Sequence, residues 1–187
     1  MVTKNKWVYA LGAQPAHGRT TITHRVGVYI MIEQRLENDE KYFNTCFKAD
    51  INNLRRAIND ALAYFDSMFT QMDDVSRLEL KVILNELLIN AVKHGGGRGG
   101  DDRYVKAVAG MATDDCAFLI VEDGGEGYDA SLVNEICRAA RYDGDFSEIE
   151  ETGRGIFIVK SLSDDFMVNE KGNKVVIIKK LRKSPIG

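Results

Sequence analysis

The chain has 187 residues, of which 44% are hydrophobic and 28% are charged. That composition allows one sizeable core, so we expect one domain with at most a small appendage. The formal net charge is -3 and the Lys and Arg residues are scattered, which disfavours nucleic acid as a partner; no apolar run approaches the roughly 20 residues that cross a membrane. We therefore expect small ligands or proteins as partners, with no nucleic acid and no membrane.

The cysteines are few and widely separated, with no CxxC pair and no histidine at metal-ligand spacing. Neither a disulfide framework nor a zinc site is predicted. The N-terminus also lacks the pattern of a signal peptide, so a cytoplasmic location is expected. The cysteines are Cys46, Cys116 and Cys137.

The first part of the chain is the hardest to interpret. We expect an N-terminal extension of unknown role over residues 1–40, followed by a domain over residues 41–187. Apolar residues alternate over 26–32, which predicts a strand, and the charged run 33–41 predicts a solvated connection. The extension could be a dimerising hairpin, a partner-binding arm or an inert appendage. Its alternation favours pairing with another strand, so a homodimer stays open.

Two helices are predicted after a short strand over residues 42–47. Asp50 is a good N-cap, and the apolar residues that follow recur at spacings of three and four. Those expected on one helical face are Ile51, Leu54, Ile58, Leu62, Phe65 and Phe69. The second helix spans residues 74–94 and is expected to be largely buried. Its apolar positions include Leu78, Val82, Leu87, Ile89 and Ala91.

The second half of the chain predicts two β-hairpins and a third helix. The hairpins pair residues 104–109 with 116–122 around a turn at 112–115, and residues 165–169 with 174–181. The polar stretch 128–152 lies between them, with one short helix near 132–140. The third helix spans residues 155–162. Hairpins imply antiparallel pairing.

Polar side chains interrupt the second helix at regular intervals. Glu86, Asn90 and the pair Lys93 and His94 recur every three or four residues, so they lie along one stripe. A solvent-facing stripe would be the ordinary explanation for any one of them. The two glycine-rich motifs further along the chain favour a functional stripe instead.

The first glycine-rich motif follows the strand at 116–122. Asp123 is followed by Gly124, Gly125 and Gly127, which would let the backbone approach a flat ligand while the carboxylate accepts a hydrogen bond. An adenine amino group is a suitable donor. An acidic residue before glycines is also common in ordinary turns, so this motif is only moderately specific.

The second glycine-rich motif is Gly153-Arg154-Gly155-Ile156, at the predicted start of the third helix. Backbone N–H groups and the helix dipole at such a start favour an anion such as phosphate. Arg154 could contact phosphate or simply be solvated.

Two other nucleotide-binding patterns do not apply. A third glycine tract formally satisfies GxGxxG through Gly95, Gly97 and Gly100, but it follows a helix rather than a strand, so a dinucleotide-binding fold is rejected. No GxxxxGK[ST] phosphate loop occurs either.

Taken in order, residues 85–95, 123–127 and 153–155 resemble the N, G1 and G2 boxes of the gyrase and histidine-kinase ATPase superfamily. Within it, residues 153–157, Asp165 and residues 172–175 are similar to those of the bacterial anti-sigma factor serine-protein kinases, the switch-protein kinases. The resemblance covers roughly residues 42–182. It implies an α/β (α+β) two-layer sandwich, with helices on one face of a mixed, mostly antiparallel sheet.

The same resemblance implies ATP and Mg²⁺ as ligands and assigns roles to individual residues. Asn90 would ligate Mg²⁺, Glu86 would be the general base, and the lid over ATP would be residues 128–152. The residues expected to bind ATP are Asn90, Lys93, His94, Asp123, Gly125, Gly127, Gly153, Arg154, Gly155 and Ile156. Lys93 or His94 could equally cap the helix C-terminus.

One departure from the family pattern concerns the last strand. Many relatives have a threonine near Asn173 or Lys174, and this sequence has no hydroxyl there. Adenine recognition would then depend more on Asp123.

The leading hypothesis is a serine/threonine-protein kinase that phosphorylates an anti-sigma factor antagonist, a STAS-type domain, and alternately sequesters a sigma factor or another regulator. A non-catalytic ATP-sensing module is the alternative that the binding motifs do not separate. A histidine-kinase catalytic domain is a third hypothesis, disfavoured because His17 and His24 lie in Gly, Pro and Thr-rich surroundings. Gyrase-like or chaperone-like coupling is disfavoured by the short chain.

Overall fold

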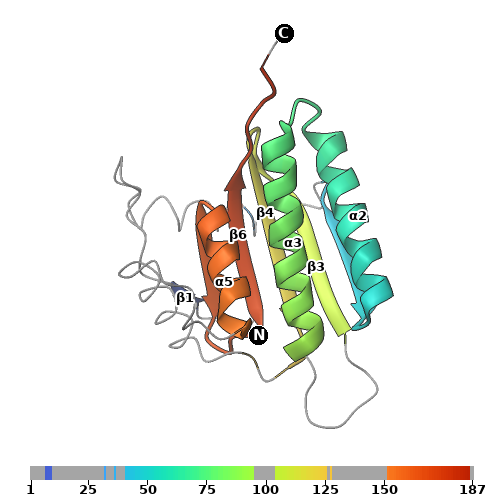
Figure 1. Cartoon of the computed structure of the whole chain (residues 1–187), viewed down its shortest axis with the longest axis vertical. Helices are drawn as coiled ribbons and strands as arrows, with labels where there is room; N and C mark the ends of the chain where they lie inside the picture. The colour runs from blue at the N-terminus through green and yellow to red at the C-terminus, as the bar shows by residue number, and fades with distance from the viewer. Residues whose placement is uncertain are drawn as a thin grey trace.

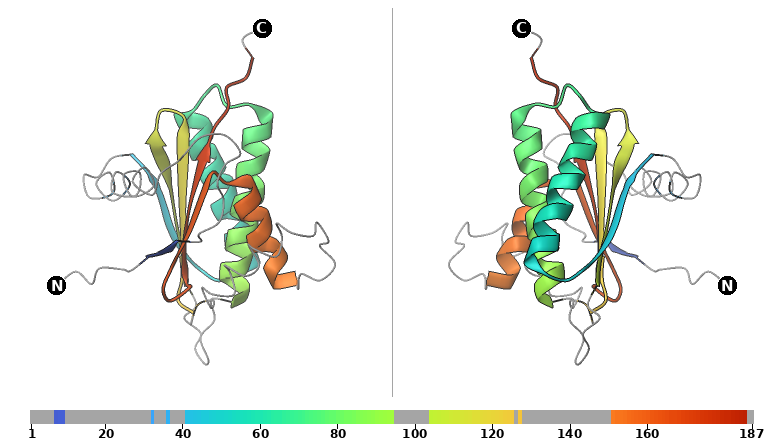
Figure 2. Two further views of the ribbon diagram at one scale, coloured as in Figure 1. Left: turned by 90° about the vertical axis from the view of Figure 1, so that its left-hand side faces the viewer. Right: turned by 90° about the vertical axis from the view of Figure 1, so that its right-hand side faces the viewer.

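The structure is a computed structural model that describes residues 7–9, 32, 36, 41–94, 104–125, 127 and 151–185. A six-stranded sheet carries helices on one face, and these helices lie side by side (Figures 1 and 2). The helices are α2 (Ile51–Met68), α3 (Asp74–His94) and α5 (Glu151–Leu162). The strands are β1 (Trp7–Tyr9), β2 (Phe43–Lys48), β3 (Tyr104–Thr113), β4 (Cys116–Asp123), β5 (Asp165–Asn169) and β6 (Lys174–Lys180).

The strand order is β1-β5-β6-β4-β3-β2, and every pairing between these strands is antiparallel. The predicted fold class is confirmed, with antiparallel pairs throughout the described sheet. Both predicted hairpins form, although β3 continues to Thr113 and so shortens the turn that we expected at 112–115. The central position of β4 explains why residues 117–121 are all buried, since both faces of that strand are covered.

Helix α2 begins where its sequence predicts. The Asp50 side chain accepts hydrogen bonds from the backbone N–H groups of Asn52 and Asn53 at 2.9 Å each, which satisfies two donors of the first turn. The buried residues of α2 recur at helical spacing: Leu54, Ala57, Ile58, Ala61, Leu62 and Phe65. Ile51 was wrongly placed on this face and is exposed, because it lies in the first turn at the end of the helix.

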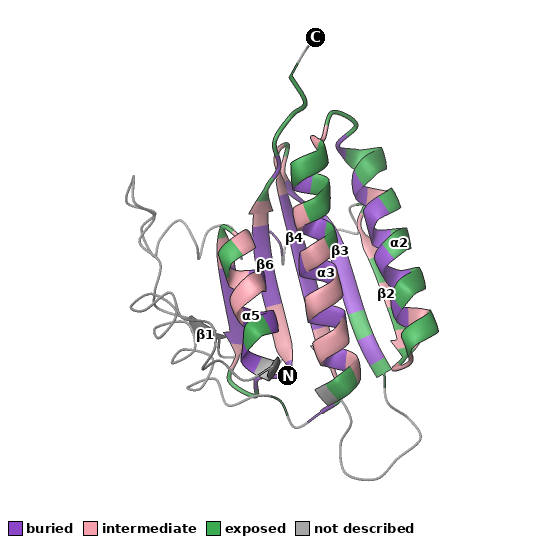
Figure 3. Ribbon diagram, viewed as in Figure 1, coloured by how far each residue is buried: buried purple, intermediate pink, exposed green. Residues whose placement is uncertain are grey.

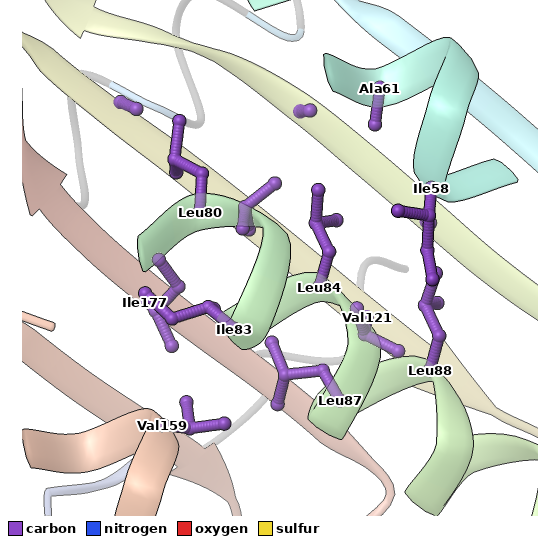
Figure 4. Packing of buried hydrophobic residues seen from close by; sticks show 14 of the residues in the cluster. Ile58, Ala61, Leu80, Ile83, Leu84, Leu87, Leu88, Val121, Val159 and Ile177 are labelled. Carbon is purple, nitrogen blue, oxygen red and sulfur yellow. The ribbon is translucent and has the colours of Figure 1, made fainter. Parts of the chain in front are cut away.

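Helix α3 supplies the centre of the core. Its inward face packs between α2, α5 and the sheet (Figure 4), while its outward face is partly open (Figure 3). The buried apolar residues of α3 are Leu80, Ile83, Leu84, Leu87, Leu88 and Ala91. Leu78 was wrongly predicted to be buried and is 61% exposed, because it lies two residues before Leu80, nearly opposite on the helix. Among the described residues, no helix is both long enough and apolar enough to cross a bilayer.

The far face of the sheet carries a second apolar cluster, which includes a residue of the N-terminal extension. Ile32 is fully buried there, and Leu36 packs against the same cluster. The other buried members are Val108, Ala112, Phe118, Ile120, Met167, Val176 and Ile178. Residues 7–9 also pair with β5 of the same chain. The extension therefore contacts its own sheet on that face and at that edge.

The strand predicted over residues 26–32 is wrong at Ile32, which is helical, and its other residues lie outside the described part. Leu36 is helical too, within the stretch for which we predicted a solvated connection. Positions four apart lie on one side of a helix, which agrees with the contact of both Ile32 and Leu36 with the same cluster.

Candidate functional site

The polar stripe of α3 meets the second glycine-rich motif where α3 and α5 pack together. A β-carbon added to Gly155 would lie 2.8 Å from Glu86 Oε2, 3.1 Å from Asn90 Nδ2 and 3.6 Å from Asn90 Oδ1. Glycine is thus the residue that lets the backbone of α5 approach both polar side chains. Glu86, Asn90 and Gly155, which the sequence placed in one site, are together in the structure.

The Asn90 amide lacks a partner that its burial requires. Within the described structure, the Asn90 Nδ2 atom is buried and has no hydrogen-bond partner. Leaving such a group unsatisfied costs about 1–3 kcal/mol. Rotation of the Asn90 amide by a half-turn would exchange its nitrogen and oxygen, so that the acceptor oxygen takes the position of Nδ2. A polar ligand or a metal ion would satisfy this group.

Helix α5 begins earlier than we predicted. It starts at Glu151 rather than at Gly155, so both glycines of the motif lie inside its first turns. Residues 151 and 152 are therefore helical and do not belong to the predicted lid. The N–H groups of the first three residues, 151–153, have no acceptor within the helix itself, and they include Gly153. The positive end of the helix dipole lies here too, so this end still suits phosphate.

The remaining predicted residues of this motif and of the stripe differ in their surroundings. Ile156 is only 5% exposed and belongs to the main core, so its side chain packs inside the protein. Arg154 and Lys93 are exposed. The side chain of His94 lies outside the described part, as do residues 95–103 with their glycine tract. ATP contact by these residues stays a prediction.

The first glycine-rich motif follows the end of β4. The Asp123 Oδ1 atom accepts a hydrogen bond of 2.8 Å from the Gly125 backbone N–H, which fixes the orientation of the carboxylate. Gly127 has a φ of +85°, a conformation that favours glycine. A β-carbon there would lie 1.8 Å from the Lys171 carbonyl oxygen. The glycine motif therefore rests on the turn between β5 and β6.

Two asparagines, one at the end of β5 and one in that turn, were not assigned to the site by the sequence analysis. Asn173 is 8% exposed, and its Nδ2 donates a hydrogen bond of 2.7 Å to the Asp123 carbonyl oxygen. Asn169 Nδ2 donates to Asn173 Oδ1 at 2.9 Å. The sequence analysis noted only that many relatives have a threonine near the position of Asn173. The contact to Asp123 joins residues 50 positions apart, so no local pattern could reveal it.

The predicted lid lies almost wholly outside the described residues. This holds for residues 128–150 and for the short helix predicted near 132–140.

Together these features define a class: an α+β sandwich with two polar residues of one helix facing a glycine of another, and an oriented carboxylate at the end of a central strand. A family model for the histidine kinase-like ATPase domain matches residues 47–179. The chain belongs to this family of histidine kinase-like ATPase domains. A search among curated proteins finds no match. Membership of the family makes ATP the expected nucleotide.

Proposed function

We propose that this chain is an ATP-dependent serine/threonine-protein kinase of the anti-sigma-factor type. Its substrate would be a hydroxyl of an anti-sigma factor antagonist, a STAS-type domain. The unphosphorylated antagonist and a sigma factor, or another regulator, would compete for the kinase, so phosphorylation would regulate transcription by partner switching. The observation that carries the proposal is the approach of Glu86 and Asn90 to Gly155.

The residues present fit a magnesium-bound triphosphate. The Asn90 amide, whose Nδ2 has no hydrogen-bond partner within the described structure, can rotate to offer its oxygen as a hard ligand to Mg²⁺. The absence of a side chain on Gly155 lets this amide lie close to α5. The N–H groups of the first turn of α5 have no acceptor within the helix itself and suit the phosphates. When bound, Mg²⁺ supplies positive charge that stabilises the transferring phosphoryl group.

Glu86 is the proposed general base. The hydroxyl oxygen of the antagonist attacks the γ-phosphorus of ATP, and the bond from that phosphorus to the bridging β-γ oxygen breaks, which releases ADP. The hydroxyl proton goes to the Glu86 carboxylate. Asp123 and its glycines hold the adenine, so that the triphosphate extends from the end of β4 toward α3 and α5.

Glu86→Gln tests this assignment, because it keeps the size of the side chain and removes its basicity. Transfer from γ-labelled ATP to a STAS-type antagonist should fall about a hundredfold or more, the usual contribution of a general base. ATP affinity, measured by calorimetry, should stay within about twofold, since the base does not hold the nucleotide in this proposal. Asp60→Asn, at an exposed carboxylate of α2, is the control. Equal transfer by wild type and Glu86→Gln would refute the mechanism.

The same assay separates the kinase from the ATP-sensing module. A kinase leaves a stable phosphoserine or phosphothreonine on the antagonist. If wild type binds ATP yet labels no antagonist, the sensing module is favoured. Label on a histidine of the chain itself would favour the histidine-kinase alternative.

A further inference from the structure

Asn173 stands out because it is a buried polar side chain with both ends of its amide occupied. It and Ser76 are the two buried polar side chains among the described residues. The amide nitrogen of Asn173 donates to the Asp123 carbonyl and its oxygen accepts from Asn169. The backbone adds a third link, from the Asp123 N–H to the Asn173 carbonyl at 3.0 Å. Asp123 is therefore held at both its backbone N–H and its backbone carbonyl.

Asn169 extends this network through the β5–β6 turn. Its Oδ1 accepts from the Lys174 N–H at 3.0 Å, and its carbonyl accepts from the Gly172 N–H at 2.9 Å. Gly172 has a φ of +77°, which favours glycine and closes the turn. The backbone of Asn169 also pairs with Trp7 of β1. The position of the Asn173 amide is thus fixed by the whole turn.

The turn also supports the glycine motif after β4. The closest contacts of a β-carbon on Gly127 would be with the Lys171 carbonyl and the Asn173 backbone nitrogen, the latter at 2.9 Å. Asp123 and Gly127, the two ends of the motif, therefore rest on one turn. A shift of Asn173 would move both.

We propose that Asn173, held by Asn169, is a positioning residue that sets where Asp123 presents its carboxylate and thereby selects adenine over guanine. The inference rests on the proposed binding of ATP. A carboxylate only accepts hydrogen bonds, so it fits the amino group at C6 of adenine and opposes the carbonyl oxygen at C6 of guanine. That selection depends on a fixed carboxylate, because a mobile one can turn away from the guanine oxygen.

The test compares Mg-ATP and Mg-GTP binding in wild type and two variants. Asn173→Asp keeps the shape and the acceptor for Asn169 but loses the donor to Asp123. Asn169→Asp keeps the acceptor for Lys174 and loses the donor to Asn173, so it perturbs the same network from the far side. ATP affinity should fall about tenfold in Asn173→Asp, the effect of one lost hydrogen bond near a charge, with a smaller fall in Asn169→Asp. GTP affinity should change by less than about twofold, so the ratio of ATP affinity to GTP affinity should fall.

Ser76→Ala is the matched control, because it also removes a buried hydrogen-bonding side chain but lies at the start of α3. Ser76 Oγ accepts from the Arg182 N–H at 2.9 Å. This variant should lose stability in urea denaturation and keep the wild-type ratio of ATP to GTP affinity. An unchanged ratio in folded Asn173→Asp and Asn169→Asp would overturn the positioning role. Absence of ATP binding by wild type would overturn the proposed function and the inference together.

Discussion

The backbone of Gly155 lies so close to Glu86 that a β-carbon on Gly155 would be 2.8 Å from Glu86 Oε2. Gly155 is inside α5, where replacing glycine by alanine ordinarily stabilises a helix by about 1 kcal/mol. Here the new methyl group must displace the end of Glu86 and press on Asn90. Alanine at Gly155 should therefore keep or raise the stability of the protein and lower its phosphotransfer activity.

We expect Gly155→Ala to unfold at the wild-type urea concentration or above it, while phosphotransfer falls at least about tenfold, since small displacements of reacting groups are costly. The measurements are urea denaturation and transfer to the antagonist. Ser161→Ala is the control, because it also raises helix propensity in α5 but lies at an exposed position of that helix. Full transfer by Gly155→Ala would show that the approach of the two helices is not needed for catalysis.

Asn90→Ala should separate ligand binding from folding. The buried Nδ2 atom has no partner to lose within the described structure, so the substitution should not lower the free energy of unfolding by more than about 1 kcal/mol. ATP binding should lose its dependence on Mg²⁺, because the proposed amide ligand is gone. Calorimetry with and without Mg²⁺ measures this. If Mg²⁺ strengthens ATP binding equally in Asn90→Ala and wild type, Asn90 is not its ligand.

Much of this fold could be predicted because its signals are local. The cap at Asp50, most of the apolar stripe of α2 and the turns of the two hairpins each lie within a few residues, and the structure has them. The position of Glu86 and Asn90 on the same side of α3 was also predictable, since a helix places residues four apart on one side.

The errors arose where packing outweighed local preference. Two glycines disfavour a helix, and we placed the start of α5 at the second of them, Gly155, yet burial of Ile156 and Val159 against the core stabilises a helix that includes both glycines. The proposed role of Asn173 depends on a hydrogen bond to a residue 50 positions away in the sequence. Ile32 packs against an apolar face of the sheet that is made by residues far away in the sequence, so the residues around Ile32 do not predict this contact.

Asp73 should make stability depend on pH in the acid range. The hydrogen bond from the Ser76 backbone N–H, followed by one from the Ser76 hydroxyl, holds the pKa of Asp73 below its ordinary value of 3.8, and Arg182 adds to this. Because the folded pKa is the lower one, the stabilisation is fully present above 3.8 and is lost as the pH falls through the folded pKa. Protonation therefore weakens the cap of α3, where the Ser76 N–H lies 2.7 Å from Asp73 Oδ1.

Asp73→Asn keeps a capping oxygen and removes the charge. We expect it to be less stable than wild type at about pH 6 and to approach wild type at about pH 3, in urea denaturation at both values. Asp115, whose pKa is also lowered by a hydrogen bond from Thr113, is present in both proteins and cancels from the difference. A constant difference across the range would assign the effect to packing instead of charge.

Ile32→Ala tests whether the N-terminal extension is part of the folded unit. Ile32 is 0% exposed within the cluster on the far face of the sheet, so truncation to alanine should lower the free energy of unfolding by about 2–4 kcal/mol. Leu78→Ala is the control, because Leu78 is 61% exposed and its truncation should change stability by less than about 0.5 kcal/mol. Urea denaturation gives both values. A loss for Ile32→Ala as small as that of the control would mean that the extension contributes little to stability in solution, leaving a role in binding a partner as the better explanation for its apolar residues.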